Sequence, residues 1–417
     1  MDVASEIFRL YFLAEFCCYL LELNGGASLK LLIYSYDWAP LVGGVQTVTM
    51  DLAREICEWS KVNRGRAFDV TLVTETPAGR SSEVSVPFRV IRRPSFLKLL
   101  GQIHSADVVH LANPALRPLA LAWLLRKPTV VEHHGYHAIC PNGLLLYKPG
   151  NSVCPGYFMA GDYQKCITCC SQTVGKLRSL RNLLLTFARR WLCQRVSANV
   201  AITDHVAARV CLAFTQRIYH GVSDHGLQVR TEKSASAANL EIGYVGRFVE
   251  EKGVPLLLQA GKKLADDGFA FHLTLIGDGS LRKELELETD RLRIRDRVTF
   301  TGYLEGPELR KALQKIPVLV MPSQSEETAG LAVMEHMMRG GVPIVADIGG
   351  LREVVGEAGL KFTRGDSDSL YRCLRELAED HSKIEALSVA ARSRAEVLFS
   401  LPVMIDNHLS LYRQLCG

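Results

Sequence analysis

Two glutamates stand eight residues apart in the segment PSQSEETAGLAVMEHMMRGGVPIVADIGG, residues 322–350. The second, Glu335, interrupts the apolar run LAVMEHMM, in which Leu331, Met334 and Met338 follow the spacing of one helix face. An ionised carboxylate on a buried helix face is costly unless hydrogen-bond donors satisfy it. Two interpretations stay open at this point: either Glu335 lies on the exposed side of its helix, or a ligand satisfies its charge.

Cations and glycines follow several apolar runs that have the character of strands. Arg247 and Lys252 come after EIGYVG, the turn Gly277–Ser280 comes after LTLI, and the pair Gly43–Gly44 comes after LLIYSYDWAPLV. Cations, glycine turns and the free amides of helix N-termini suit a diphosphate. Carboxylates nearby accept hydrogen bonds from sugar hydroxyls. The pattern therefore predicts a site for a ligand that carries both phosphates and hydroxyls.

These residues must be positioned by strands that alternate with helical segments, which is the pattern of parallel sheets covered by helices. The alternation stops in the polar stretch SDHGLQVRTEKSASAAN and then restarts, which predicts two doubly wound α/β domains with ligands at the carboxyl ends of their strands. The expected organisation is an extension over 1–27, helical or disordered; a first domain over 28–225 with a cysteine-containing insertion over 140–170; a linker over 226–239; a second domain over 240–395; and a C-terminal helix over 396–417 that packs back on the first domain.

Composition sets wide bounds on function. The chain has 417 residues, of which 48% are hydrophobic and 22% charged, with a formal net charge of +5. This length accommodates two domains with separate cores. The charge is modest, so we expect no nucleic-acid partner. The apolar N-terminal segment is interrupted by charges, which disfavours a signal peptide, and a cytoplasmic location is expected.

The segment SEETAGLAVMEHMMRGGVPIVADIGGLREVV resembles the E-x7-E signature of the retaining glycosyltransferases of family 4, also called glycosyltransferase group 1. Further stretches resemble the family pattern and occur in its order: IYSYDWAPLVGGVQTV, IGYVGRFVEEKGV, LIGDGSLRKELE, VTFTGYL and AGLKF. The resemblance extends from about Lys30 to the C-terminus. It implies the GT-B fold, in which two Rossmann-like domains face a central cleft, here an acceptor-side domain over 28–225 and a nucleotide-sugar-binding domain over 240–395.

The resemblance implies a role for each matching residue. His134 would lie near the reacting sugar, Glu327 would contact the donor sugar, and Glu335 would bind the ribose hydroxyls of the nucleotide. Arg247 and Lys252 would hold the donor diphosphate. The other donor-binding residues would be Gly43, Gly44, Gly277, Thr328, Ala329, Gly330 and Leu331.

The implied reaction moves a sugar from a nucleotide-diphosphate sugar to a hydroxyl of a glycan, a lipid-linked molecule or a polysaccharide precursor, with retention of configuration. Cations would stabilise the departing diphosphate, so neither a cofactor nor a metal is expected. Two alternatives stay open: a nucleotide-sugar epimerase of the same fold, or a nucleotide-sugar-binding protein without turnover. The second is raised by Ala329, where the family commonly has phenylalanine, and by RIYHGVSD in place of the usual Asn-Gly-Val-Asp.

Two further patterns concern metal ions. Asp366 and Asp368 form a D-x-D sequence, but they precede a predicted helix, where aspartate and serine commonly act as caps. Four cysteines of the insertion, Cys140, Cys154, Cys166 and Cys169, could hold a structural zinc, although their spacing matches no common zinc module. Free thiols or disulfides are the alternatives to zinc.

The segment 176–195 is basic and amphipathic. No acidic residue occurs between Asp162 and Asp204. The cations are Lys176, Arg178, Arg181, Arg189, Arg190 and Arg195, and they are interspersed with Leu183, Leu184, Leu185, Phe187 and Trp191. Such a helix either packs on the first sheet as an ordinary solvated helix or lies on an anionic membrane surface. The second interpretation predicts a peripheral protein at the cytoplasmic face of a membrane.

Overall fold

A computed structural model describes the chain except for residues 1–27, 40–42, 64–66, 79–84, 225–238 and 417. The chain divides into two compact units, Met1–Val130 with Leu409–Gly417, and Val131–His408, and each is described by itself. The predicted extension over 1–27 and nearly all of the predicted linker lie outside the described residues. Each of the described helices is too short or too polar to cross a bilayer.

The first sheet is built from seven strands in the order β3-β2-β1-β4-β5-β8-β9, and the division into units falls within β5. The non-consecutive order and the parallel pairs β1–β2, β1–β4, β2–β3 and β8–β9 are those of a doubly wound sheet. The strands are β1 (Leu29–Ser35), β2 (Phe68–Thr74), β3 (Arg89–Arg92), β4 (Val108–Leu111), β5 (Thr129–His133), β8 (Ala198–Ala201) and β9 (Thr215–Arg217). Their helices are α2 (Gly44–Val62), α3 (Phe96–Ser105), α4 (Leu116–Leu124) and α7 (Asp204–Val210).

The last residues of the chain belong to the same unit as strands β1 to β4. They form the end of α15 (Leu401–Cys416). The hydroxyl of Tyr412 lies 2.9 Å from Nδ1 of His110 on β4, and the guanidinium of Arg413 lies over the ring of Trp59 on α2. These contacts tie the C-terminus to elements from the beginning of the chain.

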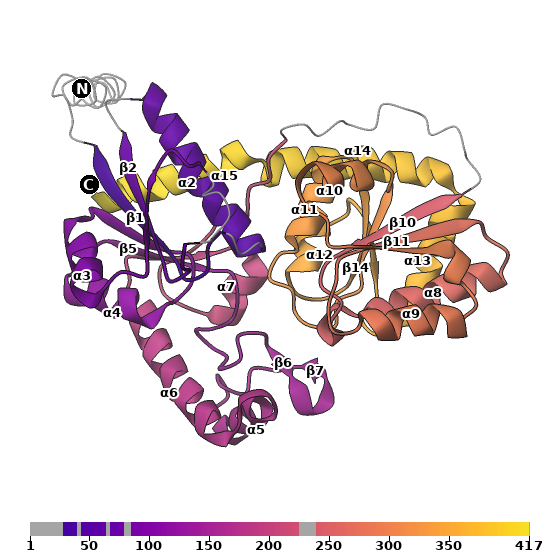
Figure 1. Cartoon of the computed structure of the whole chain (residues 1–417), viewed down its shortest axis with the longest axis horizontal. Helices are drawn as coiled ribbons and strands as arrows, with labels where there is room; N and C mark the ends of the chain where they lie inside the picture. The colour runs from indigo at the N-terminus through magenta and orange to yellow at the C-terminus, as the bar shows by residue number, and fades with distance from the viewer. Residues whose placement is uncertain (1–27, 40–42, 64–66, 79–84, 225–238, 417) are drawn as a thin grey trace, which may run out of the picture. The chain divides into compact units, whose positions relative to one another are not determined.

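The second sheet has six strands in the order β12-β11-β10-β13-β14-β15, paired in parallel throughout. In Figure 1, helices α8, α9 and α13 cover one face and α11, α12 and α14 cover the other. The strands are β10 (Leu240–Val245), β11 (Phe271–Ile276), β12 (Val298–Gly302), β13 (Val318–Met321), β14 (Val342–Ala346) and β15 (Leu360–Phe362). The helices are α8 (Val254–Asp266), α9 (Arg282–Arg291), α10 (Gly306–Gln314), α11 (Leu331–Met338), α12 (Gly349–Val355), α13 (Ser367–Glu379) and α14 (His381–Leu398).

The order of this sheet reverses at β10, which lies between β11 and β13. Ligands of open α/β sheets bind outside the carboxyl ends of the strands at such a reversal. The central strands are nearly continuous apolar runs, such as Val318–Met321, because both faces of the sheet are covered by helices. The predicted alternation of strands and helices is therefore confirmed in both halves of the chain.

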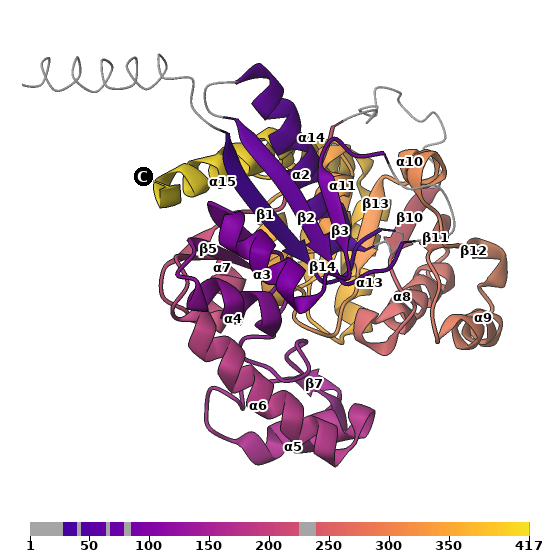
Figure 2. The same ribbon diagram turned by 60° about the vertical axis from the view of Figure 1, so that its left-hand side comes forward.

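The insertion forms a small substructure made of the hairpin β6 (Leu146–Tyr147) and β7 (Ser152–Val153), followed by α5 (Tyr163–Val174) and α6 (Lys176–Cys193). Helices α5 and α6 pack side by side (Figure 2). The cysteines of the insertion are buried free thiols. Clusters of ligand atoms close enough to share a metal ion occur among the described residues, but none of these clusters contains a cysteine. The zinc alternative, like that of free thiols, stays a prediction.

The D-x-D sequence has the capping role that the sequence predicts. The carboxylate of Asp366 accepts hydrogen bonds from the backbone N–H groups of Asp368 and Ser369, at the start of α13. These bonds satisfy two of the amides that a helix N-terminus leaves without an intrahelical partner.

Candidate active site

The loops after β10 and β13 are bound together by close backbone contacts within the second unit. Gly253 has a φ of 67°, and a Cβ at this position would lie only 2.0 Å from the carbonyl oxygen of Pro322. The backbone N–H of Gln324 donates to the carbonyl oxygen of Glu251 at 2.8 Å. Only glycine allows the first loop to approach the second this closely. The two loops therefore form one structural unit.

The loop after β11 joins the same assembly. Gly277 has a φ of 139°, and a Cβ there would lie 1.9 Å from the carbonyl oxygen of Gly246. The backbone N–H of Phe248 donates to the carbonyl oxygen of Asp278 at 2.9 Å. Arg247 thus lies in the loop at the carboxyl end of the central strand β10, and this loop is held by the loops after β11 and β13 on its two sides.

Lys252 and Glu327 form an ion pair across these loops. The Lys252 Nζ donates to Oε1 of Glu327 at 2.5 Å, and the hydroxyl of Ser323 donates to the same oxygen at 2.7 Å. Their side chains are 20% and 17% exposed, so the pair is largely shielded from water. Burial by itself raises the pKa of the Glu327 carboxyl, but Lys252, Ser323 and the charge of Arg247 outweigh burial and lower that pKa. Glu327 is therefore ionised at neutral pH.

Arg247 differs from Lys252 because its side chain is 71% exposed. Its guanidinium lies 3.9 Å from the carboxylate of Glu251, a contact that solvent screens. The cation nevertheless contributes to the lowered pKa of the Glu327 carboxyl. Arg247 is thus available to an anionic ligand at the surface of the loops.

The two adjacent glutamates of the motif have different partners. Glu326 accepts from Nε of Arg209 at 3.0 Å and lies 3.3 Å from Nε2 of His205. Arg209 also donates to the carbonyl oxygen of Cys154 in the insertion, at 2.7 Å. Glu326 is therefore held in a structural ion pair, whereas Glu327 points to Lys252. The structure thus separates two residues that the sequence distinguishes by spacing alone.

The segment 328–331 is held by hydrogen bonds from distant parts of the chain. The hydroxyl of Thr328 donates to the carbonyl oxygen of His134 at 3.1 Å, and the hydroxyl of Thr203 donates to the carbonyl oxygen of Thr328 at 2.8 Å. Gly330, with a φ of 83°, precedes α11, which begins at Leu331. The first amides of α11 therefore lie beside Glu327, and Ala329 between them is buried.

Glu335 lies at a half-buried position of α11, next to fully buried Met334. The charge of Glu335 acts on Arg339, one helical turn later, where it partly offsets the lowering of the arginine pKa by burial. A cation on the same helix is thus one source of stabilisation for this carboxylate. The role of Glu335 in binding ribose stays a prediction.

Gly43 and Gly44 belong to the first unit. Gly43 is extended, with a φ of −178°, and Gly44 is the first residue of α2. A Cβ at Gly43 would meet only the flexible side chain of Gln46. The pair therefore presents backbone at a helix N-terminus, as the sequence predicts, and its contact with a donor stays a prediction.

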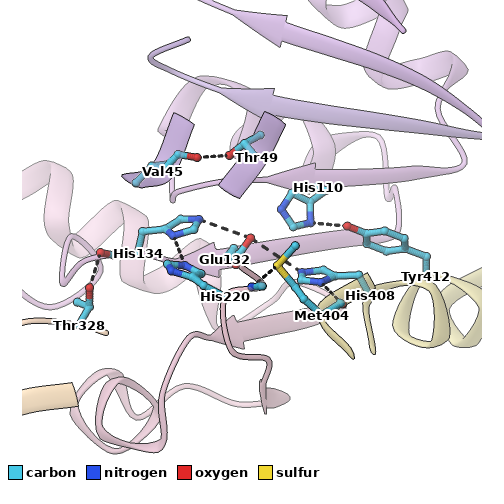
Figure 3. Close-up of polar contacts among 11 residues, drawn as sticks. Val45, Thr49, His110, Glu132, His134, His220, Thr328, Met404, His408 and Tyr412 are labelled. Atoms are coloured by element: carbon cyan, nitrogen blue, oxygen red, sulfur yellow. Dashed lines mark hydrogen bonds and ion pairs between the residues drawn. The ribbon is translucent and has the colours of Figure 1, made fainter. Parts of the chain in front are cut away.

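His134 belongs to a buried polar cluster at the end of β5 (Figure 3). Its Nδ1 lies 2.9 Å from Nε2 of His220, and its Nε2 lies 3.5 Å from a carboxylate oxygen of Glu132. The same carboxylate lies 4.0 Å from Nε2 of His408. Glu132 and His134 share one face of β5 because side chains alternate along a strand.

The partners of His134 assign the protons on the two rings. A carboxylate only accepts, so Nε2 of His134 carries the proton that faces Glu132, and Nδ1 accepts from Nε2–H of His220. His220 is neutral, because burial and the neighbouring His134 lower its pKa to about 3. The two contacts lie on opposite sides of the His134 ring. The His134–His220 contact is a hydrogen bond, and the ligand atoms of Glu132, His134 and His220 lie within 4.8 Å of one another, close enough to share a metal ion.

His133 has a structural role on the opposite face of β5. Its Nε2 lies 2.9 Å from Oδ1 of Asn199, whose amide nitrogen donates to the carbonyl oxygens of Cys193 and Ala213. Burial lowers the pKa of His133 to about 4, so it is a neutral core residue. Of the two adjacent histidines, His134 alone contacts the segment that follows Glu327.

Sequence reasoning missed Glu132 and His220. His220 is the histidine of RIYHGVSD, the stretch that departs from the family pattern. It is positioned by the next residues: the Gly221 N–H lies 3.0 Å from the Met404 sulfur, and the Val222 N–H donates to the carbonyl oxygen of Phe399. A signal was present in the sequence, since Glu132 is a carboxylate within an apolar strand and stands two residues before His134.

Two family models match the chain. The model for glycosyl transferases group 1 matches residues 230–394, and the model for glycosyltransferase family 4 matches residues 42–224. The 2-deoxystreptamine glucosyltransferase of Streptomyces kanamyceticus is 30% identical over 241 residues, which are 53% of this chain and 61% of that protein. The sulfoquinovosyl transferase SQD2 of Arabidopsis thaliana is 32% identical over 331 residues, 75% of this chain and 57% of that protein. The matches thus span less than two thirds of the length of these relatives.

Solved structures agree on the fold. Anabaena HepE in complex with UDP and glucose superposes with a TM-score of 0.65 at 16% identity, covering 93% of this chain and all of that chain. Sucrose-phosphate synthase from Thermosynechococcus elongatus gives 0.67 at 18% identity, with 93% and 99% covered. The two Rossmann-like sheets are those of the GT-B fold. The chain belongs to the group 1, family 4 glycosyltransferases.

Proposed function

We propose that the protein is a retaining glycosyltransferase that transfers a sugar from a nucleotide-diphosphate sugar to a hydroxyl of a glycan, a lipid-linked acceptor or a polysaccharide precursor. The observation that carries this proposal is the buried Lys252–Glu327 pair with exposed Arg247 beside it, at the carboxyl ends of β10 and β13. The complex of HepE with UDP and glucose supports a nucleotide-sugar donor. Sugar identity and linkage are left open.

Different residues bind the diphosphate, the sugar and the ribose of the donor. Arg247 and Lys252 bind the diphosphate, and the first amides of α11 support it, because a helix N-terminus attracts anions. Glu327 is ionised and accepts from a hydroxyl of the sugar, and Glu335 accepts from the ribose. Gly277, Thr328, Ala329, Gly330 and Leu331 line the donor site, and Gly43 and Gly44 are proposed as further donor-binding residues.

The chemical step releases a diphosphate whose negative charge grows as the glycosidic bond of the donor breaks. Two preorganised cations meet this charge, which is transition-state stabilisation. The departing phosphate accepts the acceptor proton on the face that it leaves, so the configuration of the sugar is retained. Because Arg247, Lys252 and amides neutralise the diphosphate, we expect turnover to need neither a metal nor another cofactor.

His134 links the two polar clusters. Its carbonyl oxygen positions Thr328, and Nδ1 has a single lone pair that accepts from His220 in this structure, so a hydrogen bond from a sugar hydroxyl to Nδ1 would replace the one from His220. Glu132 orients the ring and holds the proton on Nε2. Glu132 and His220 are thus positioning residues in this proposal, and His134 contacts the substrate.

A panel of UDP-, GDP- and ADP-sugars tests the proposal. The correct donor should raise the melting temperature, because a ligand that binds the native state stabilises it. With a donor that binds, proton NMR of the product should show the anomeric configuration of the donor, in the presence of EDTA. An inverted product would contradict the mechanism, and binding without transfer to any hydroxyl acceptor would favour a binding protein without turnover.

A further inference from the structure

Helix α6 carries an exposed apolar stripe within the second unit. The side chains of Leu177, Leu180, Leu184, Phe187 and Trp191 recur at alternating steps of three and four residues, so they lie along one face of the helix. All five are exposed, and Leu177 and Leu184 are 83% and 59% exposed. The buried residues Ser179, Leu183 and Thr186 lie on a neighbouring face of α6, roughly 100° round the helix from the centre of the stripe. Apart from Phe187, which also contacts α5, the stripe is separate from the buried residues of α6.

Cations flank the stripe on both sides. At 100° per residue, Arg181 adjoins one edge of the stripe and Lys176 adjoins the other, whereas Arg178 lies further round the helix beyond Arg181. All three are exposed, and none forms an ion pair within the described part of the chain. Because no acidic residue occurs between Asp162 and Asp204, the whole face is positive and apolar.

The stripe is presented by a rigidly held helix. The ring of Phe187 packs 4.8 Å from that of Phe158 and 5.0 Å from that of Tyr163, where α5 begins. Arg190 donates to the carbonyl oxygens of Val210 and Cys211. The helix therefore stays folded and fixed while its outer face remains in solvent.

We propose that this face of α6 lies on the surface of an anionic lipid bilayer, with the leucines and aromatic rings at the acyl boundary and the cations at the headgroups. Charge complementarity selects this occupant. The spacing of the stripe also resembles the seam of a paired helix, but a second copy of α6 would bring cations against cations with no carboxylate on either helix. An anionic bilayer accommodates both features, because its acyl boundary buries the apolar stripe and its headgroups pair with the neighbouring cations. The inference does not rest on the proposed sugar transfer.

Cosedimentation with lipid vesicles tests the surface directly. The full-length protein is mixed with vesicles of phosphatidylcholine, with and without phosphatidylglycerol. Binding is expected to the anionic vesicles, with much weaker binding to pure phosphatidylcholine, and salt should weaken it, because counterions screen the surface charge. Failure to bind anionic vesicles at low salt would overturn the proposal.

Two sets of variants locate the binding face. Leu177→Ser with Leu184→Ser should lower vesicle binding about tenfold, since each exposed leucine loses apolar burial at the membrane. Lys176→Gln, Arg178→Gln and Arg181→Gln together should lower binding to anionic vesicles about a hundredfold, because each cation near the surface contributes about fivefold. Both sets change exposed residues, so melting temperatures should be close to wild type.

Matched controls change the same chemistry elsewhere in the second unit. Leu287→Ser with Val389→Ser removes two exposed apolar side chains from α9 and α14, and Lys283→Gln, Arg310→Gln and Lys311→Gln remove three exposed cations from α9 and α10. Both controls should bind anionic vesicles like the wild type. Equal losses in the control and α6 variants would overturn the proposal. So would sedimentation velocity that shows a dimer in solution which the leucine variants dissociate, because the stripe would then be an interface between copies.

Discussion

Two polar clusters of the second unit are built on opposite principles. The first, Lys252 with Glu327 and Arg247, is a charged cluster at loop ends, where a buried carboxylate stays ionised because cations surround it. The second, Glu132 with His134 and His220, lies beside a buried strand and contains one imidazole, that of His220, which burial keeps neutral. The contrast indicates that charged side chains cluster where a diphosphate is proposed to bind, whereas the neutral ring of His220 helps to hold its neighbouring side chains in position. Both clusters meet at the hydrogen bond from Thr328 to the carbonyl oxygen of His134.

The largest effect is expected for Arg247→Ala. Loss of a preorganised contact to developing charge typically lowers turnover about 10²–10³-fold. Stability should change by less than about 0.5 kcal/mol, because the side chain is largely exposed and its contact with Glu251 is long. Steady-state kinetics and urea unfolding check both expectations, and Lys283→Ala, an exposed cation on α9, is the control. Wild-type turnover in Arg247→Ala would place the phosphate site elsewhere.

Lys252→Ala sharpens the same comparison, because it removes the partner of a buried carboxylate. It should unfold more easily than Arg247→Ala, by roughly 3–5 kcal/mol, as is typical when one member of a buried pair is removed. Adding Glu327→Gln should restore much of the stability without restoring turnover. Equal stability of the single and double variants would show that the pair does not stabilise the loops.

Glu335→Gln should weaken donor binding by about 1.5–3 kcal/mol, the contribution of a hydrogen bond to a charged group. The structure sharpens this prediction, since the charge of Glu335 already interacts with Arg339 without nucleotide. Calorimetry with the nucleoside diphosphate is the measurement. Unchanged affinity in a folded variant would assign Glu335 to its helix alone.

The histidine cluster should make stability depend on pH. Between the ordinary histidine pKa of about 6.5 and the lowered pKa of His220, about 3, the unfolded chain binds a proton that the native protein does not. Stability should therefore fall as the pH falls through this window, by up to about 1.4 kcal/mol per pH unit for one such group. His133, with its pKa of about 4, adds to the same slope. Urea unfolding at several pH values should show a shallower slope in His220→Gln, and an identical slope would contradict the assignment of a neutral His220.

The smallest effect is expected for Glu132→Gln. The contact from Glu132 to His134 is long, so its loss should lower kcat about threefold to tenfold, the range of a modest hydrogen bond. The pH profile of kcat should shift as well, because Glu132 holds the proton on Nε2 of His134. A merely structural role would lower the melting temperature and leave the pH profile of the folded fraction unchanged.

The sequence predicted the charged cluster far better than the neutral one. Arg247, Lys252 and Glu327 each follow a strand within a continuous motif, and parallel strands bring such positions to one edge of a sheet. Glu132, His220 and His408 come from three distant segments, and their contacts depend on how β5, the segment after β9 and the start of α15 pack. No local spacing encodes that packing. For the same reason, the sequence could not show that Glu326 is bound by Arg209 and His205.

The fold was predictable because apolar strands, glycine turns and helix caps are local signals. The alternation and the capping role of Asp366 could therefore be derived from short windows. The short strands β6, β7, β9 and β15 were not predicted as strands, since two or three residues carry no clear period. The stripe on α6 was visible only in part, because burial decides which leucines of a leucine-rich helix face solvent.

The most direct test of the account compares a nucleoside diphosphate with the corresponding monophosphate in calorimetric titrations. If Arg247 and Lys252 form the phosphate site, the wild type should bind the diphosphate at least about tenfold more tightly, in line with one charge-assisted contact. Arg247→Ala should largely remove that preference while leaving the affinity for the monophosphate nearly unchanged. Equal affinities for the two nucleotides in the wild type, or a preference that survives in the variant, would contradict the account.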